Sequence, residues 1–190
     1  MRIIAGELRG RRIAAPEGRT TRPTPDRVRE ALFSALESRL GGPGSLEGLR
    51  VLDLFAGSGA LGIEALSRGA ARVTFVERDR HALSALQQNL KSLGVEAQTR
   101  VLAEDAERAL DRLAGGGERF DVAFLDPPYG TPETVASLAA LGQTGLLAEH
   151  GVVVLEHATE DAPPAEPGLA VLRTRAYGTV SLTYYAKGTS

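Results

Sequence analysis

The sequence predicts an α/β fold built on a mostly parallel β-sheet with helices on both faces. From about residue 49 onward, short apolar runs alternate with longer segments of helical periodicity, the order typical of strand-helix-strand units. The apolar runs at residues 51–55 and 120–125 end in loops rich in Gly or Pro. The end of the chain differs, because two alternating runs flank Tyr177-Gly178 and predict an antiparallel hairpin.

Composition limits the organisation of the chain. With 190 residues and 43% hydrophobic content, it suits one well-packed domain and is too short for two. No apolar run approaches the roughly 18 residues that a membrane helix needs, and no charged-then-apolar leader follows Met1. We therefore expect a cytoplasmic protein that does not bind a membrane.

The cysteine and histidine content narrows the chemistry. The chain has no Cys, which excludes a disulfide framework, a thiolate zinc site and the Cys nucleophile used to methylate pyrimidine ring carbons. His81, His150 and His157 have no metal-binding spacing, so we expect no metal and assign them surface or structural roles.

The amino-terminal part is basic although the whole chain carries a formal charge of −2. We expect an RNA-binding arm at residues 1–24, with a hairpin between 2–6 and 8–13, ahead of a domain at 25–190. Arg is used almost to the exclusion of Lys, which suits bidentate phosphate contacts and stacking on bases. The alternative is a solvated charged face. The candidate RNA contacts are Arg9, Arg11, Arg12, Arg22, Arg27 and Arg29.

The first helix is expected to start with Thr24 as N-cap and Pro25 at the first helical position. Val28, Leu32, Leu36 and Leu40 would form its apolar face, and the run Gly41-Gly42-Pro43-Gly44 would end it. The later elements are expected in this order: strand 51–55, helix 58–68 closed by Gly69, strand 73–76, helix from Asp79 to Gly94, strand about 96–102, helix about 105–113, strand 120–125, helix 132–141, strand 151–156, and strands 169–174 and 179–185.

The glycine-rich turn at residues 57–62 permits two interpretations. It satisfies the dinucleotide fingerprint, with Glu77 about twenty residues further on, where a ribose-binding acid belongs. However, Asp53 in the preceding strand disfavours a pyrophosphate at the helix terminus. A ligand with a positive amine suits Asp53 better. S-adenosylmethionine carries an ammonium and a sulfonium and no phosphate, so we favour it over NAD.

The second loop, Asp126-Pro127-Pro128-Tyr129, follows the apolar run at 120–125. The Asp126 carboxylate and a neighbouring carbonyl can accept hydrogen bonds from a planar amine, while Tyr129 covers the face of a base. The alternative is a simple turn after a core strand, since Asp and Pro are ordinary turn residues.

Together, Asp-Leu-Phe-Ala-Gly-Ser-Gly at 53–59 and Asp-Pro-Pro-Tyr at 126–129 resemble the S-adenosylmethionine-dependent methyltransferases that modify exocyclic amines of nucleic-acid bases. With the segments at 2–6, 9–11 and 21–33, the chain is similar to the bacterial 16S ribosomal RNA guanine-N2 methyltransferases of the RsmD type. The resemblance implies a Rossmann-like methyltransferase fold with a seven-stranded sheet. It also implies methylation of a guanine, expected to be guanine 966, by a monomer acting on an assembling small ribosomal subunit, with S-adenosylhomocysteine as product.

The resemblance also implies roles for individual residues. Asp53 and residues 56–59 would hold the methionine end, Glu77 the ribose hydroxyls, and Asp105 with Ala106 the adenine edge. Asp105 is equally suited to be a plain helix N-cap. The full cofactor set is Asp53, Phe55, Ala56, Gly57, Ser58, Gly59, Glu77, Arg78, Asp105 and Ala106, and the catalytic set is Asp126, Pro127, Pro128 and Tyr129.

Two other functions are compatible with these motifs. One is DNA adenine-N6 methylation, for which the chain has little room for a region that reads duplex DNA. The other is a non-catalytic RNA-binding factor, which would have no use for both loops. Phe55 and Tyr177 are aromatic candidates for the base site, or else core residues.

Overall fold

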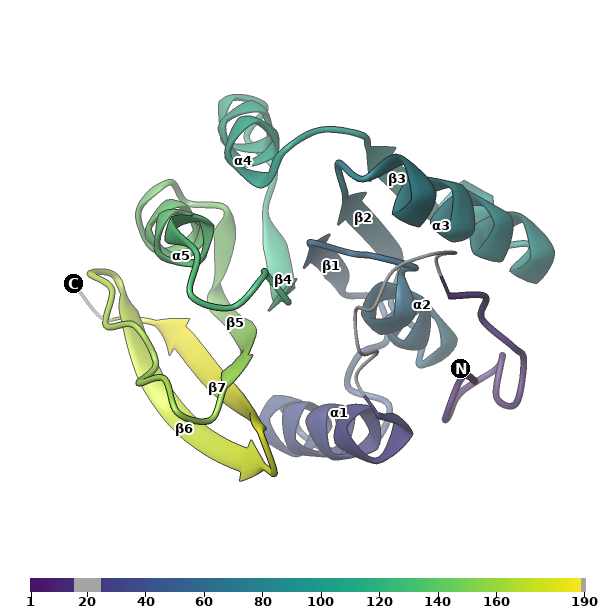
Figure 1. The fold of residues 1–190 in the computed structure, drawn as a ribbon, viewed down its shortest axis with the longest axis horizontal. Coiled ribbons are helices and arrows are strands. Elements are labelled where there is room, and N and C mark those ends of the chain that lie inside the picture. The colour runs from purple at the N-terminus through teal and green to yellow at the C-terminus, as the bar shows by residue number, and fades with distance from the viewer. Residues whose placement is uncertain (16–24, 189–190) are drawn as a thin grey trace.

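Among residues 1–15 and 25–188, which the computed structural model describes, seven strands form one sheet in the order β3-β2-β1-β4-β5-β7-β6 (Figure 1). β1, β2, β3, β4 and β5 pair in parallel, whereas β7 is antiparallel to both β5 and β6. The predicted parallel sheet and terminal hairpin are therefore confirmed. The strands are β1 (Arg50–Leu54), β2 (Arg72–Val76), β3 (Thr99–Leu102), β4 (Phe120–Leu125), β5 (Leu147–Ala158), β6 (Leu169–Tyr177) and β7 (Val180–Lys187).

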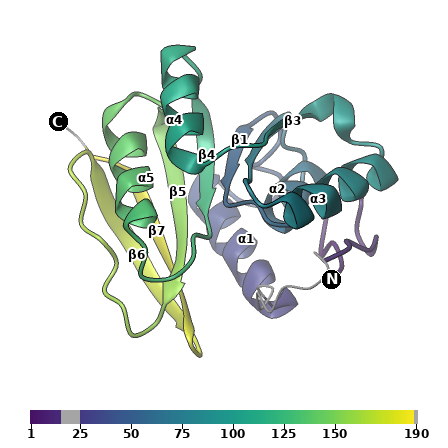
Figure 2. The same cartoon turned by 45° about the horizontal axis from the view of Figure 1, so that its top comes forward.

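Helices cover both faces of this sheet. The helices are α1 (Asp26–Leu40), α2 (Ala60–Ser67), α3 (Arg80–Leu93), α4 (Ala106–Gly115) and α5 (Pro132–Gln143), with a 3-10 turn η1 (Glu96–Gln98). One core cluster holds the apolar faces of α1, α2 and α3, and a second holds those of α4 and α5. Figure 2 shows α4 and α5 side by side over their part of the sheet.

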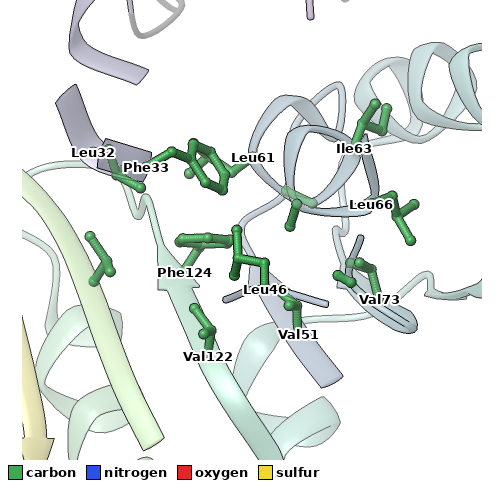
Figure 3. Packing of buried hydrophobic residues seen from close by; sticks show 14 of the residues in the cluster. Leu32, Phe33, Leu46, Val51, Leu61, Ile63, Leu66, Val73, Val122 and Phe124 are labelled. Carbon is green, nitrogen blue, oxygen red and sulfur yellow. The ribbon is translucent and has the colours of Figure 1, made fainter. Parts of the chain in front are cut away.

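Core packing fixes α1 against the central strands. Phe33 of α1 meets Phe124 of β4 edge to face, with ring centroids 5.5 Å apart (Figure 3). Alternate residues of a strand point to opposite faces, so Phe124 joins the α1 side and Leu125 joins the α4 and α5 side. The central strands are therefore apolar on both faces, and polar chemistry is confined to their ends.

Several element boundaries differ from the predicted ones for local reasons. Pro25 is the N-cap of α1 and not its first helical residue, while Thr24 lies outside the described residues. α2 begins at Ala60 because Gly59 has a left-handed backbone, φ 82°, which a right-handed helix cannot include. Residues 96–98 form η1, and β3 begins only at Thr99. Asp79 caps α3 and Gly94 ends it, as predicted.

The amino-terminal arm forms the expected hairpin pairing and packs on the domain. Arg2 and Arg12 form an antiparallel bridge, and the side chain of Ile3 is buried in the core. The amides of Ile4 and Ala5 donate to the buried Glu64 carboxylate at 2.8 and 3.0 Å. The arm is therefore held by residues of α2, whereas the division into units at residue 24 stays a prediction.

Within the described residues, no helix is both long and apolar enough to cross a membrane. In the same part of the chain, no group of three or more His, Cys, Asp or Glu side chains gathers as a metal-binding cluster.

Candidate active site

The two predicted loops meet at one edge of the sheet. β1 and β4 are neighbours, with Leu54 paired to Leu125, and the backbone amide of Asp126 lies 3.5 Å from the carbonyl of Leu54. The turn after β1 and the loop after β4 therefore begin side by side. This is the carboxyl edge of a parallel sheet, where ligands bind in open α/β folds.

The glycine turn keeps its backbone exposed at one position and tightly packed at another. Gly57 has φ 56°, and a Cβ built there meets no atom within 4 Å. Gly59 has φ 82°, and a Cβ there would lie 2.4 Å from Cδ1 of Leu86. Gly57 therefore leaves room for a ligand against its backbone, whereas Gly59 allows α2 to approach α3.

Other residues near this turn are held firmly. Ala56 donates its amide to the carbonyl of Val76 at 3.0 Å. Ser58 is buried, and its carbonyl accepts from Nδ2 of Asn89 at 3.0 Å. In the described residues, Phe55 is the non-glycine residue with positive φ, 62°, and it lines a cavity of about 70 Å³ with Glu77, Asp105 and Ala106. This strained backbone turns the chain from β1 into the glycine turn.

Asp53 is almost fully buried below the turn, with 2% of its surface exposed. Its Oδ2 accepts the amide of Gly62 at 2.8 Å. Burial raises the pKa of Asp53 to about 8, the Gly62 hydrogen bond acts against this, and the charge of Glu77 adds to it. A cationic group bound nearby would lower this pKa and stabilise the carboxylate.

Glu77, at the end of β2, ties the turn to the next loop. Its Oε2 accepts the amide of Gly57 at 2.8 Å, and its Oε1 accepts the amides of Arg78 and Asp79, each at 2.8 Å. The Arg78 side chain is exposed and pairs with Glu133 at 2.8 Å. Oε2 accepts only one of these bonds and keeps a second lone pair, so Glu77 can still accept a hydroxyl group.

Asp105 and Ala106 lie at the start of α4. Asp105 caps this helix, accepting the amide of Arg108 at 3.0 Å. Both residues line a cavity of about 590 Å³ together with Arg78 and Glu133. The N-cap interpretation of Asp105 is confirmed, and its contact with an adenine stays a prediction.

The loop after β4 borders a second cavity of about 550 Å³. Pro127 is buried, and Tyr129 is 47% exposed with its hydroxyl donating to Oε1 of Glu156 at 3.1 Å. Arg27, at the start of α1, and Tyr177, at the end of β6, line the same cavity. The cavity thus has an aromatic face, two carboxyl groups and a cation.

Burial governs the electrostatics of this cavity. Desolvation raises the pKa of Asp126 well above its usual value, and the charges of Glu156 and Asp53 raise it further. Burial, followed by the charges of Glu156 and Asp126, also raises the pKa of Tyr129. Tyr129 is therefore a neutral hydrogen-bond donor across the physiological range of pH.

Comparison with known proteins identifies the family. The model described as Conserved hypothetical protein 95 matches residues 1–186. The chain belongs to this family.

Several relatives of this Conserved hypothetical protein 95 member align along almost all of its length. YlbH of Bacillus subtilis is 42% identical over 188 residues, covering 98% of this chain and 99% of YlbH. Ribosomal RNA small subunit methyltransferase D of Escherichia coli K12 is 36% identical over 188 residues, covering 98% and 90%. The solved structure of Escherichia coli yhhF superposes with a TM-score of 0.83 at 32% identity, covering 98% and 97%. The fold is the predicted Rossmann-like methyltransferase fold.

The arginines predicted to contact RNA have different environments in this family member. Arg9, Arg12 and Arg27 are exposed, whereas Arg22 lies outside the described residues. Arg11 is exposed and donates to the carbonyl of Ser92 at 2.8 Å. The role of these five arginines as RNA contacts remains a proposal.

The assignment of Arg29 to the RNA surface is wrong. Its side chain is fully buried, donates to the carbonyl of Arg2 and pairs with Asp26 at 3.2 Å. Arg29 lies one residue from Val28 on the core-facing side of α1, so the helix turns it inward. Its guanidinium fastens the arm to α1 and cannot reach a nucleic acid.

Sequence reasoning missed Glu156 in this Conserved hypothetical protein 95 chain. Glu156 is 4% exposed near the end of β5 and accepts the Tyr129 hydroxyl. The signal was present, because a Glu ends the apolar run at 151–155 just as Asp126 ends the run at 120–125. Tyr177 also reaches the cavity, and its buried hydroxyl has no hydrogen-bond partner within the described residues.

The histidines fit their predicted roles. His157 is buried, with Nε2 2.8 Å from Oγ1 of Thr183, while His81 and His150 are exposed.

Proposed function

We propose that this protein transfers the methyl group of S-adenosylmethionine to the exocyclic N2 amine of a guanine in 16S ribosomal RNA. The observation that carries the proposal is the position of the Gly57 turn and the Asp126 loop on adjacent strand ends. A relative that is 36% identical along nearly the whole chain is named Ribosomal RNA small subunit methyltransferase D, which supports the same substrate class.

The first strand end fits the methyl donor. S-adenosylmethionine, when bound, supplies an electrophilic methyl group on a sulfonium. The open space at Gly57 admits a ligand against the backbone, and the buried Asp53 carboxyl suits its ammonium. Glu77 would accept the ribose hydroxyls, and Asp105 with Ala106 would border the adenine. Phe55, Ala56, Ser58, Gly59 and Arg78 complete the proposed set.

The second strand end fits the amine. The N2 nitrogen of guanine is a weak nucleophile because its lone pair is delocalised into the ring. In the proposed reaction, Asp126 and the Pro127 carbonyl accept its N–H groups, which favours a pyramidal nitrogen aimed at the methyl group. Pro128 keeps the loop rigid, and Tyr129 covers the face of the base, which must leave its stack. Orientation and electrostatics supply most of the gain.

The proposed RNA surface consists of the arm and one arginine of this cavity. Arg27 lines it, and Arg9, Arg11 and Arg12 are exposed on the arm, where they suit phosphate contacts. We further propose that a monomer acts on an assembling small ribosomal subunit.

The test is methyl transfer from labelled S-adenosylmethionine to small-subunit particles that lack the modification, followed by nucleoside analysis. Label in N2-methylguanosine is expected. Label in N6-methyladenosine would overturn the base assignment. Binding of the cofactor without any transfer would indicate a non-catalytic factor.

A further inference from the structure

Glu156 occupies a position in the base cavity that the proposed reaction leaves unexplained. Leu125 of β4 pairs with Leu155 of β5, so Asp126 and Glu156 follow at neighbouring positions on parallel strands. Both residues line the cavity of about 550 Å³, and Glu156 is only 4% exposed. The cavity therefore presents two adjacent carboxyl groups to whatever enters it.

This pair is electrostatically costly. Burying a carboxylate costs free energy, and a second acid beside it adds repulsion. The hydroxyl of Tyr129 donates to Oε1 of Glu156 at 3.1 Å, but a neutral Gln oxygen would accept that bond without the repulsion. A ligand with two adjacent hydrogen-bond donors would match the two adjacent carboxyl groups of this cavity.

Guanine has this arrangement of donors. Its Watson-Crick edge carries N1–H beside the N2 amine, whereas adenine carries an acceptor, N1, beside its N6 amine. We propose that Glu156 is a specificity-determining residue that accepts N1–H of the target guanine while Asp126 accepts the N2 amine. This inference rests on the proposed function and deepens it. A carboxylate facing N1 of adenine would leave two acceptors opposed.

The contacts of Glu156 suit this role. The Tyr129 hydroxyl orients the carboxylate, so that it is preorganised before the base arrives. A carboxylate has about four lone-pair sites, so in this proposal it accepts N1–H as well as the Tyr129 hydroxyl. A site built to accept an N–H group strongly rejects an analogue that lacks it.

The test compares two bases that share the reacting amine. 2-Aminopurine retains the exocyclic amine of guanine but has an acceptor at N1. Ribosomal RNA carrying either base at the methylated position is assembled into small-subunit particles, and methyl transfer is measured with labelled cofactor. The wild-type protein is expected to prefer guanine by roughly tenfold or more in kcat/KM. Equal rates on the two bases would overturn the inference.

A variant then tests which residue reads N1. Glu156→Gln keeps an oxygen for Tyr129 and offers an amide donor to the N1 acceptor, so the preference should fall to about one or reverse. Glu149→Gln, the same change at an exposed site on β5, should keep the wild-type preference. A Glu156→Gln protein with the wild-type preference would overturn the inference.

Failure of the underlying function gives a different result. If the wild-type protein methylates neither RNA while binding S-adenosylmethionine, the proposed function fails, and the inference fails with it. If the guanine RNA is methylated and 2-aminopurine is methylated equally well, only the role of Glu156 fails.

Discussion

Burial decides how the carboxyl groups of the site titrate. Asp53 and Glu156 are buried, with 2% and 4% of their surface exposed, and Asp126 is half-buried. The pKa of Asp126 is raised by desolvation and by its neighbours, so it gains a proton more readily than an exposed Asp. A protonated carboxyl group still has a carbonyl oxygen that accepts an N–H group. In the proposed reaction, Asp126 therefore needs only to accept a hydrogen bond and does not need a full negative charge.

Replacement of Asp126 tests this directly. Asp126→Ala should reduce kcat by about 100- to 1,000-fold, because the amine loses its main acceptor. Asp126→Asn should retain far more activity, because its carbonyl oxygen remains. Titration calorimetry should show nearly unchanged affinity for S-adenosylmethionine in both variants. A large loss of affinity would mean that Asp126 belongs to the cofactor site.

Asp53 should couple cofactor binding to protons. With a pKa of about 8, it is mostly protonated at pH 7, and a bound ammonium would favour the carboxylate. Binding should therefore release close to one proton at pH 7, and affinity should rise with pH until about 8. Calorimetry in two buffers of different ionisation enthalpy measures the release.

Asp53→Asn is the control for that proton. The Asn oxygen can still accept the amide of Gly62, so the turn is preserved while the ionisable group is lost. The release should shrink in this variant, and an unchanged release would assign the proton to another group.

The apo protein should respond to pH in the opposite sense. The raised pKa means that the folded state binds the Asp53 proton more tightly than the unfolded state. This contribution is fully present below pH 4 and is lost as pH rises to about 8. This contribution comes from Asp53 alone. It is therefore measured as the difference in unfolding free energy between wild type and Asp53→Asn, followed as a function of pH.

Two glycines of the glycine turn, two positions apart, are needed for different reasons. Gly57 faces open space and Gly59 faces Leu86, although both have positive φ. Gly57→Ala should therefore cost about 1–2 kcal/mol of stability from backbone strain and greatly weaken cofactor affinity. Gly59→Ala should cost more stability, roughly 2–5 kcal/mol, because strain and overpacking add.

Urea unfolding and calorimetry separate these effects. Gly59→Ala is expected to lose more unfolding free energy than Gly57→Ala. Gly57→Ala is expected to lose more affinity for S-adenosylmethionine than Gly59→Ala. The reverse order would place the ligand away from Gly57.

The order of elements was predictable because hydrophobic periodicity and Gly or Pro breakers mark each strand and helix. In contrast, the sequence did not predict which polar side chains are buried. Arg29 lies among Asp26, Arg27 and Glu30 in the sequence, and only the path of the arm over α1 reveals that its guanidinium is enclosed. Likewise, Glu156 is enclosed by β4 and β7, which are distant in sequence. The loops were found because glycine and proline act locally, whereas partners across the sheet are set by the fold.

In the whole molecule the basic arm packs on α2 and α3. Arg9→Gln with Arg12→Gln should weaken RNA binding uniformly and reduce the slope of log affinity against log salt by roughly 1 per lost phosphate contact. Arg72→Gln, at the amino end of β2 and away from the site, is the matched control. If the double variant keeps the wild-type slope, RNA docks elsewhere.

The bonds between the arm and α2 also set an order for folding. Synthesis runs from the amino terminus, so Ile4, Leu8 and Ala14 are made long before their partners Glu64, Ser67 and Asn89, which lie 60, 59 and 75 residues later. The first segment to leave the ribosome must therefore wait for α2 and α3 before it can dock. In a nascent chain, the arginines proposed to contact RNA therefore reach their final position only after α2 and α3 have been made.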